Sequence, residues 1–185
     1  MMDQTHNNSL KSIYEEYADT LYSYGCKFTR DKELVKDCIH DIFVYLHSID
    51  SQSVRNIKFY LLQALKNNLI TKLSKIGETT YPENLEFTIP NPETIETVLL
   101  QEEESQRINI LLQTALNTLT NRQKEAIYLY YIEELEYAEI CRLLDMNYQS
   151  VRNLIHRALS NLRKTMNEKD LMLVYFLIHL SLIYQ

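Results

Sequence analysis

Apolar residues recur every three or four positions through the first part of the chain, a spacing typical of helices that bury one face. The pattern predicts a helix over residues 10–24 that continues up to Arg30 and Asp31, followed by helices over residues 32–47 and 56–75. Three amphipathic helices can cover one another's apolar faces. We therefore expect a compact three-helix bundle in this part of the chain.

The second part of the chain is also predicted to be helical, after a linker. Residues 77–91 hold all three prolines and one of the two glycines, and their glutamates should keep this stretch solvated. Asn91, Pro92 and Glu93 are suited to an N-cap, a first helical position and a first-turn acid, so a helix should begin there. It should run to about residue 119, and further helices are predicted, after an N-cap at Thr120, over residues 121–132, 136–144 and 148–166.

The predicted fold class is all-α, with two small helical domains joined by an acidic linker. The expected bounds are 8–76 for the first domain, 77–92 for the linker, 93–166 for the second domain and 167–185 for an apolar tail. Two glycines in 185 residues are too few for the turns of a β-sandwich or a phosphate-binding α/β fold. The chain has no glycine-rich phosphate loop, nucleophile elbow or paired metal motif, so we expect no enzyme activity, no cofactor and no bound metal.

The cysteines and the start of the chain bear on its location. Cys26, Cys38 and Cys141 are odd in number and far apart, which fits buried thiols better than a disulfide framework or a metal site. Residues 1–9 are polar, with neither a basic leader nor an apolar core, so no signal peptide is expected. The expected location is the reducing cytoplasm.

Charge is distributed unevenly along the chain. The formal net charge of −6 argues by itself against a nucleic-acid partner. However, residues 51–76 contain five basic residues and no acid, and residues 142–164 contain five basic residues and one acid. Eight glutamates are concentrated between them, over residues 77–104. Two basic blocks separated by an acidic segment are compatible with a polyanion that contacts both domains.

Residues 136–164 have the pattern of a helix-turn-helix. The connection over residues 145–147 has a suitable length, and Asp145 stands where the turn needs a left-handed residue, which aspartate tolerates. On the second helix, Val151 and Ile155 belong to an apolar face, whereas the opposite face is basic and rich in hydrogen-bonding groups. Such a face can read base edges in the major groove of DNA. The alternative is an ordinary amphipathic helix with a solvated basic face.

Several stretches resemble the sigma-70 family of transcription initiation factors. The stretches LNTLTNRQK (116–124), IEELEYAEICRLL (132–144) and SVRNLIHRALSNLRK (150–164) look like region four, which reads the minus-thirty-five promoter element. In the first domain, YEEYADTLY (14–22), ELVKDCIHDIFVYL (33–46) and FYLLQALKNNLI (59–70) look like region two, which in the family grips the polymerase clamp and the melted minus-ten element. No segment resembles the extra domains of larger members, which favours the compact extracytoplasmic-function class.

The chain departs from the family pattern at several positions. Glu134 and Asp145 stand where glycine is usual, and Glu136 stands where a serine N-cap is usual, so that cap should be weaker. Because of these departures, and of four more given next, the resemblance does not predict which promoter sequence the chain would read. The further departures are His47, Thr71, Asn153 and Leu154.

The resemblance implies three sets of functional residues. Those expected at the minus-thirty-five element, with Arg122 and Arg163 as phosphate contacts, are Arg122, Ser150, Arg152, Asn153, His156, Arg157 and Arg163. Those expected at the melted minus-ten element, near the loop over residues 48–54, are Arg55, Asn56, Lys58, Tyr60, Lys66 and Asn67. Those expected to face the polymerase are Asp37, His40, Asp41 and His47. Two alternatives stay open: Tyr60 as a core residue, and a metal site built on His40 and His47.

The resemblance also implies the partners, which are core RNA polymerase, promoter DNA and an anti-sigma factor, with the chain monomeric when free. The alternative is a dimeric helix-turn-helix regulator of duplex DNA, which would not explain the acid-free helix over residues 56–75. The apolar run over residues 171–184 is shorter than the roughly 20 residues of a membrane span, so we expect no stable membrane insertion. It is expected to fold back on the second domain, with docking to a partner or to a membrane surface as alternatives.

Overall fold

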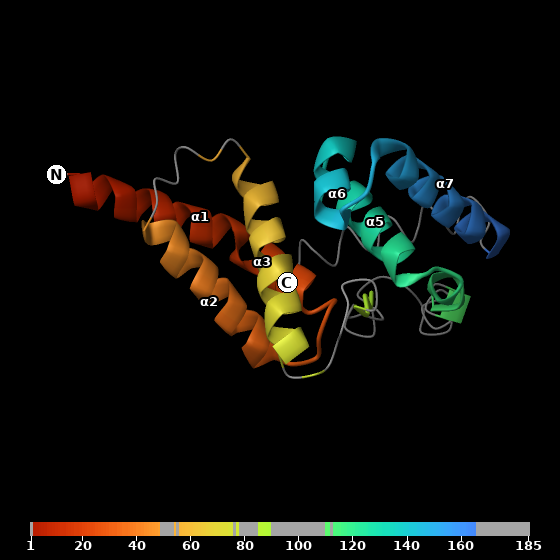
Figure 1. Ribbon diagram of the computed structural model, residues 1–185, viewed down its shortest axis with the longest axis horizontal. Helices are drawn as coiled ribbons and strands as arrows, with labels where there is room; N and C mark the ends of the chain where they lie inside the picture. Colours follow the sequence, from red (N-terminus) through yellow and green to blue (C-terminus); the bar gives the residue numbers. More distant parts are fainter. Residues whose placement is uncertain are drawn as a thin grey trace, which may run out of the picture. The chain divides into compact units, whose positions relative to one another are not determined.

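The computed structural model describes residues 2–48, 54, 56–75, 77, 85–89, 110–111 and 113–165, and for residues 2–9 the backbone alone. Within these ranges the ordered elements are all α-helices, as Figure 1 shows, which confirms the predicted fold class. The chain divides into two compact units, Met1–Glu86 and Phe87–Gln185. Among the described residues, no helix is long and apolar enough to cross a membrane, and the tail over residues 167–185 lies outside them.

The first unit is a bundle of three helices that pack against one another (Figure 1). They are α1 (Met2–Gly25), α2 (Lys32–Ser48) and α3 (Ile57–Lys75). The side chains at the predicted apolar positions of α2 and α3 point inward, because residues three and four apart share a helix face. The fully buried residues of this core include Leu21, Tyr24, Val35, Cys38, Leu46, Leu62, Leu65 and Leu69.

The first helix ends earlier than its sequence pattern indicates. The expected continuation beyond Gly25 is wrong, because the chain turns there and the amide of Phe28 donates to the carbonyl of Gly25 at 3.0 Å. This turn buries Phe28, whose ring meets that of Tyr24 edge-on with the ring centroids 5.0 Å apart. Asp31, expected to break the helix, serves to start α2, since its Oδ1 accepts a hydrogen bond from the amide of Leu34 at 3.0 Å.

Gly25, the last residue of α1, lies against side chains of α2 and α3. A Cβ atom at this position would stand 2.5 Å from Cγ1 of Val35 on α2 and 3.5 Å from a methyl group of Leu65 on α3. Val35 and Leu65 are both fully buried, so neither side chain has free space to move into. The missing side chain of Gly25 therefore allows the close packing of the three helices.

The second unit is built on α5 (Asn121–Tyr131), α6 (Tyr137–Leu144) and α7 (Tyr148–Thr165), preceded by helical residues 110–111 and 113–117. Each of the three helices packs on the other two. Thr120 caps α5 as predicted: the amide of Gln123 donates to the Thr120 hydroxyl at 3.3 Å, and the Gln123 side chain accepts from the amide of Thr120 at 3.0 Å. One cluster of its core contains Ala115, Leu116, Leu119 and Ala158.

The segment expected as a solvated linker is not solvated throughout. Leu85 and Phe87 are both buried, and Phe87 is only 1% exposed. The ring of Phe87 packs edge-on against that of Tyr128, with the ring centroids 5.7 Å apart. Burial of these two apolar side chains outweighs the polarity of the neighbouring glutamates, so the expectation is wrong at these two positions. The expected helix start at Asn91 lies outside the described residues.

Two loops of the second unit contain a residue in the left-handed conformation, with φ of 54° at Glu134 and 51° at Asp145. The left-handed Asp145 was predicted from the turn, and both residues stand where the resembling family has glycine. For a residue other than glycine, the left-handed conformation costs about 1–2 kcal/mol relative to the right-handed one. We expect Glu134→Gly and Asp145→Gly to raise the free energy of unfolding by up to about 1 kcal/mol each, with part of the gain offset by the larger unfolded-state entropy of glycine.

Thermal unfolding of the full chain tests this expectation. Glu136→Gly is the matched control, because Glu136 has an extended backbone with φ of −68° and gains nothing from glycine. A midpoint for Glu134→Gly at or below that of Glu136→Gly would show that the left-handed backbone carries no strain at Glu134.

Candidate nucleic-acid interface

Helices α6 and α7 form the predicted helix-turn-helix. Asp145 ends α6 in the left-handed conformation, and the amide of Met146 donates to the carbonyl of Cys141 at 2.9 Å. Asn147 caps α7, since its Oδ1 accepts a hydrogen bond from the amide of Ser150 at 2.8 Å. These local bonds fix the direction in which α7 leaves the turn.

The start of α6 is supported despite its unusual cap residue. The amide of Glu136 donates to the carboxylate of Glu139 at 3.0 Å, and the carbonyl of Glu136 accepts from the amide of Ile140 at 3.0 Å. Glu139 also places a negative charge in the first turn, where the helix dipole favours it. The carboxylate of Glu139 thus satisfies one amide at a helix start that was expected to be weak.

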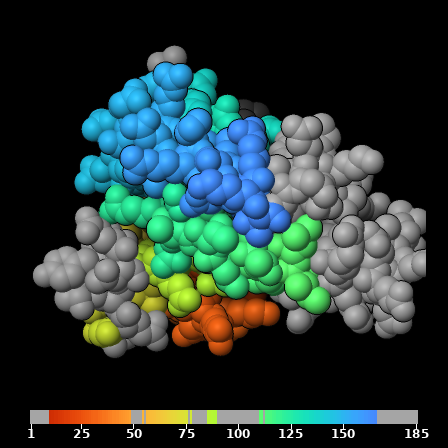
Figure 2. Space-filling model, turned by 90° about the vertical axis from the view of Figure 1, so that its right-hand side faces the viewer, coloured from red at the N-terminus to blue at the C-terminus, as the bar shows by residue number. Residues whose placement is uncertain are grey.

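The two faces of α7 differ as its sequence pattern predicts. Val151, Ile155 and Ala158 are buried against the rest of the second unit, whereas the opposite face is in water. In Figure 2 the side chains of α7, drawn in blue, form part of the surface of this unit. The sequence-predicted residues that are exposed on α7 are Arg152, Asn153, His156, Arg157 and Arg163.

Ser150 and Arg122 are less accessible than the other predicted contacts. Ser150 lies half-buried in the first turn of α7, and Arg122 lies half-buried near the start of α5. Arg122 also takes part in interactions within the protein. The structure therefore places a basic strip of exposed side chains along α7, with these two residues outside its most exposed part.

Four tyrosine rings join the ends of the helices around the helix-turn-helix, and sequence reasoning missed them. Tyr130 meets Tyr131 and Tyr137 with ring centroids 4.8 Å and 5.1 Å apart, and Tyr137 meets Tyr148 at 5.3 Å. Burial raises the pKa of Tyr137, and its tyrosine neighbours add to this effect. The rings follow no helical period, because they come from three different helix ends, so only the first positions of α6 and α7 could have suggested the contact.

The sequence-predicted residues of the first unit do not share one environment. Asn56 and Asn67 are exposed, whereas Lys58 and Tyr60 are half-buried. The ammonium group of Lys66 is 5.9 Å from the centre of the Phe28 ring, and Lys66 is only 9% exposed. Lys66 is therefore buried in the bundle, unlike Asn56, Lys58, Tyr60 and Asn67. Arg55 and the loop over residues 49–53 lie outside the described residues.

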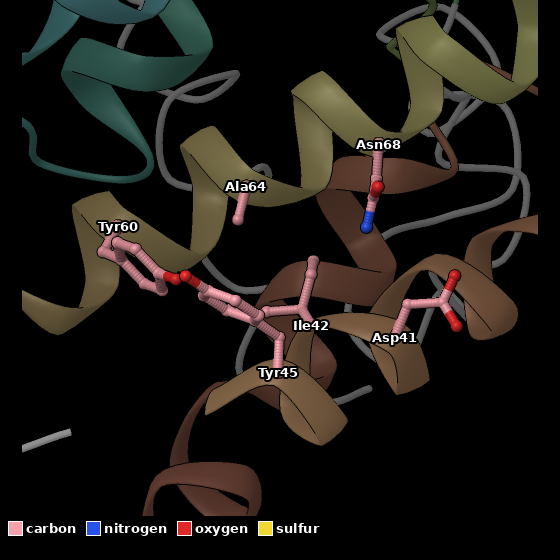
Figure 3. A pocket seen from close by; sticks show the side chains of 6 residues that line it. All are labelled: Asp41, Ile42, Tyr45, Tyr60, Ala64 and Asn68. Atoms are coloured by element: carbon pink, nitrogen blue, oxygen red, sulfur yellow. The ribbon is translucent and has the colours of Figure 1, made fainter. Parts of the chain in front are cut away.

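A groove between α2 and α3 connects two of the predicted residue sets (Figure 3). It has a volume of about 360 Å³ and is lined on one side by Asp41, Ile42 and Tyr45 of α2. Tyr60, Ala64 and Asn68 of α3 line the other side, and the hydroxyl groups of Tyr45 and Tyr60 point toward one another. Burial raises the pKa of Tyr60, with a further contribution from Tyr45. Sequence reasoning named Asp41 and Tyr60 separately but gave no signal that α2 and α3 bring them to one groove.

The polar side of α2 carries the residues expected to face the polymerase. Asp37, His40, Asp41 and His47 are all exposed. Asp41 forms an ion pair with Lys72 of α3, with Oδ2 and Nζ 2.8 Å apart, and this hydrogen bond is the main reason that the pKa of Lys72 is raised. Within the described ranges, no group of three His, Cys, Asp or Glu residues could hold a metal ion.

Comparisons with known proteins match most of the chain. The family described as sigma-70, region 4, matches residues 109–162. The ECF RNA polymerase sigma factor SigM of Bacillus subtilis (strain 168) is 24% identical over 164 residues, which cover 86% of this chain and 96% of SigM. The RNA polymerase sigma factor YlaC of the same organism is 22% identical over 185 residues, covering 88% of this chain and 95% of YlaC.

A solved structure has a similar fold. It is the sigma factor RpoE of Bartonella quintana in complex with the anti-sigma factor NepR. The likeness has a TM-score of 0.58 at 18% sequence identity and covers 85% of this chain and 96% of the other. The two helical units thus occur together in a solved protein of similar length.

Proposed function

We propose that the chain is a sigma factor of the sigma-70 family, in its extracytoplasmic-function class, and that it binds core RNA polymerase and directs it to promoters. In this proposal α7 contacts the minus-thirty-five element and the first unit contacts the melted minus-ten element. The observation that carries the proposal is that α7, the second helix of a helix-turn-helix, has an exposed basic face. The chain would then act in transcription initiation and not as an enzyme, like the sigma factors to which it is similar.

The proposed contacts at the minus-thirty-five element divide into two kinds. Arg152, Asn153, His156 and Arg157 lie in the first three turns of α7, the part of a recognition helix that reaches base edges. Arginine can bond guanine through two hydrogen bonds, which gives these positions base specificity. Arg163 lies near the end of α7, where a phosphate contact is the better fit because the helix leaves the groove there.

The first unit is proposed to hold the single strand and the polymerase on different residues. Asn56, Lys58, Tyr60 and Asn67, at the start and middle of α3, offer amides, an aromatic ring and a cation to unstacked bases. The exposed polar side of α2 is proposed to face the polymerase. An anti-sigma factor is a further proposed partner, because the similar RpoE fold was solved with one.

Binding to core RNA polymerase is the test of this proposal. Purified core enzyme mixed with the full chain should elute as one complex, and that complex should start transcription at a cognate promoter. The double variant Asp37→Ala/His40→Ala should weaken complex formation, whereas Asp19→Ala, an exposed acid on α1, is the matched control and should not. Asp41 is left intact because its ion pair with Lys72 joins two helices.

The alternative function, a dimeric regulator of duplex DNA, makes opposite predictions. It requires a stable dimer in solution and tight binding to a palindrome without polymerase. The proposed sigma factor is expected to bind promoter duplex weakly when free, because eight glutamates over residues 77–104 are tethered between its basic blocks. Tight polymerase-independent binding at physiological salt, together with failure to bind core enzyme, would establish the regulator instead.

A further inference from the structure

A pair of amide side chains lies at the start of α7, beside the basic strip. The Nε2 of Gln149 donates a hydrogen bond to the Oδ1 of Asn153 at 3.0 Å. Both residues are exposed, and they lie four positions apart, so they occupy the same face of the helix. Gln149 was not among the residues expected to read DNA.

The hydrogen bond determines which groups each amide can still offer. Gln149 keeps its Oε1 as an acceptor and one hydrogen on Nε2 as a donor. Asn153 uses one lone pair of its oxygen to accept from Gln149, so the groups that it mainly offers to a ligand are the two hydrogens of Nδ2. The pair therefore presents one acceptor-and-donor amide next to one donor amide.

This order of groups matches the edges of two neighbouring bases in a major groove. Adenine offers N7 as an acceptor and N6 as a donor, which complement the free groups of Gln149. Guanine and thymine offer acceptors at N7 and O6 or at O4, which complement the Nδ2 of Asn153.

We propose that Gln149 and Asn153 act as one base-reading unit, in which Gln149 reads an adenine and orients Asn153 toward an adjacent guanine or thymine of the minus-thirty-five element. The inference rests on the proposed function and names the base preference of the same helix face. In this unit Gln149 has two roles, because it contacts one base and positions the side chain that contacts the next.

Transcription by the polymerase complex from promoters with a randomised minus-thirty-five element tests the proposal. Wild type should prefer adenine at one position and guanine or thymine at the next. Gln149→Ala and Asn153→Ala should each reduce the preference at both positions by roughly tenfold. The double variant should lose no more than the stronger single variant, because either change breaks the same unit.

Gln149→Glu makes the test sharper. A carboxylate of similar size cannot donate to the Asn153 oxygen or to adenine N7, but it accepts a hydrogen bond from the N4 of cytosine. The preferred base at the first position should therefore change from adenine to cytosine, with the specificity at the second position reduced. All three substitutions are at exposed sites, and unchanged thermal unfolding will show that the fold is intact.

The outcomes separate this inference from the function on which it rests. If wild type starts transcription at specific promoters and Gln149→Ala keeps the wild-type preference at every position, the amide pair is not a reading unit although the function stands. If wild type with core polymerase shows no promoter preference at all, both the function and the inference are wrong.

Discussion

Replacing Arg152 or Arg157 with alanine is expected to reduce transcription from a cognate promoter by at least roughly tenfold for each residue, because a good base contact contributes about 1–3 kcal/mol of discrimination. Both side chains are exposed on the face of α7 opposite Val151 and Ile155, so their removal leaves the core of the second unit intact. The loss should fall on promoters that carry the preferred minus-thirty-five bases, because a base contact distinguishes sequences whereas a phosphate contact does not.

The measurement is transcription by the reconstituted polymerase complex on a preferred promoter and on one with altered minus-thirty-five bases. Lys164→Ala is the matched control, since it removes one exposed positive charge from the last turn of the same helix. It should lower transcription from both promoters equally and only slightly. Wild-type transcription by both single arginine variants and by the double variant would exclude α7 as the recognition helix.

Replacing Gly25 with alanine is expected to destabilise the first unit, although alanine is the better helix former. Alanine gains about 1 kcal/mol in helix propensity over glycine. Against this, the new Cβ would stand 2.5 Å from a methyl group of Val35, and forcing an extra group into a packed core costs about 1–3 kcal/mol. We expect a net loss of up to about 2 kcal/mol, which lowers the unfolding midpoint by several degrees in a domain of this size.

Thermal unfolding followed by circular dichroism checks this result, with the transitions of the two units analysed separately. The double variant Gly25→Ala/Val35→Ala provides the control, because shortening Val35 makes room for the new methyl group. It should be less destabilised than the sum of its two single variants. A Gly25→Ala variant that unfolds at the wild-type midpoint would show that α1 and α2 can move apart without lowering the free energy of unfolding.

The elements that could be predicted from the sequence are those set by local rules. Helix periodicity located α2, and the residue types at Thr120 and Asp145 predicted a cap and a left-handed turn that the structure confirms. Each of these features depends on residues within a few positions of one another. The same holds for the two faces of α7, whose buried and exposed residues follow from its period.

The features that could not be predicted depend on residues that are distant in sequence. Phe87 is buried because its ring meets that of Tyr128 on α5. The groove between Tyr45 and Tyr60 exists only once α2 and α3 have packed. Periodicity specifies which face of a helix is apolar, but not which neighbour will cover it.

The contacts that two lysines make within the protein have a consequence for the response of the protein to ionic strength. A cation that contacts a phosphate of a single strand releases counterions. In a plot of the logarithm of the binding constant against the logarithm of the salt concentration, each such contact adds about −0.7 to the slope. If all five basic residues of the 51–76 block contacted phosphates, the slope would be about −3.5. Lys66 lies over Phe28 and Lys72 is paired with Asp41, so we expect a slope nearer −2 for binding of a minus-ten single strand to the full chain. Lys72→Met should leave that slope unchanged in an anisotropy titration, because in this protein the Lys72 charge neutralises a carboxylate of its own chain and displaces no ions from DNA.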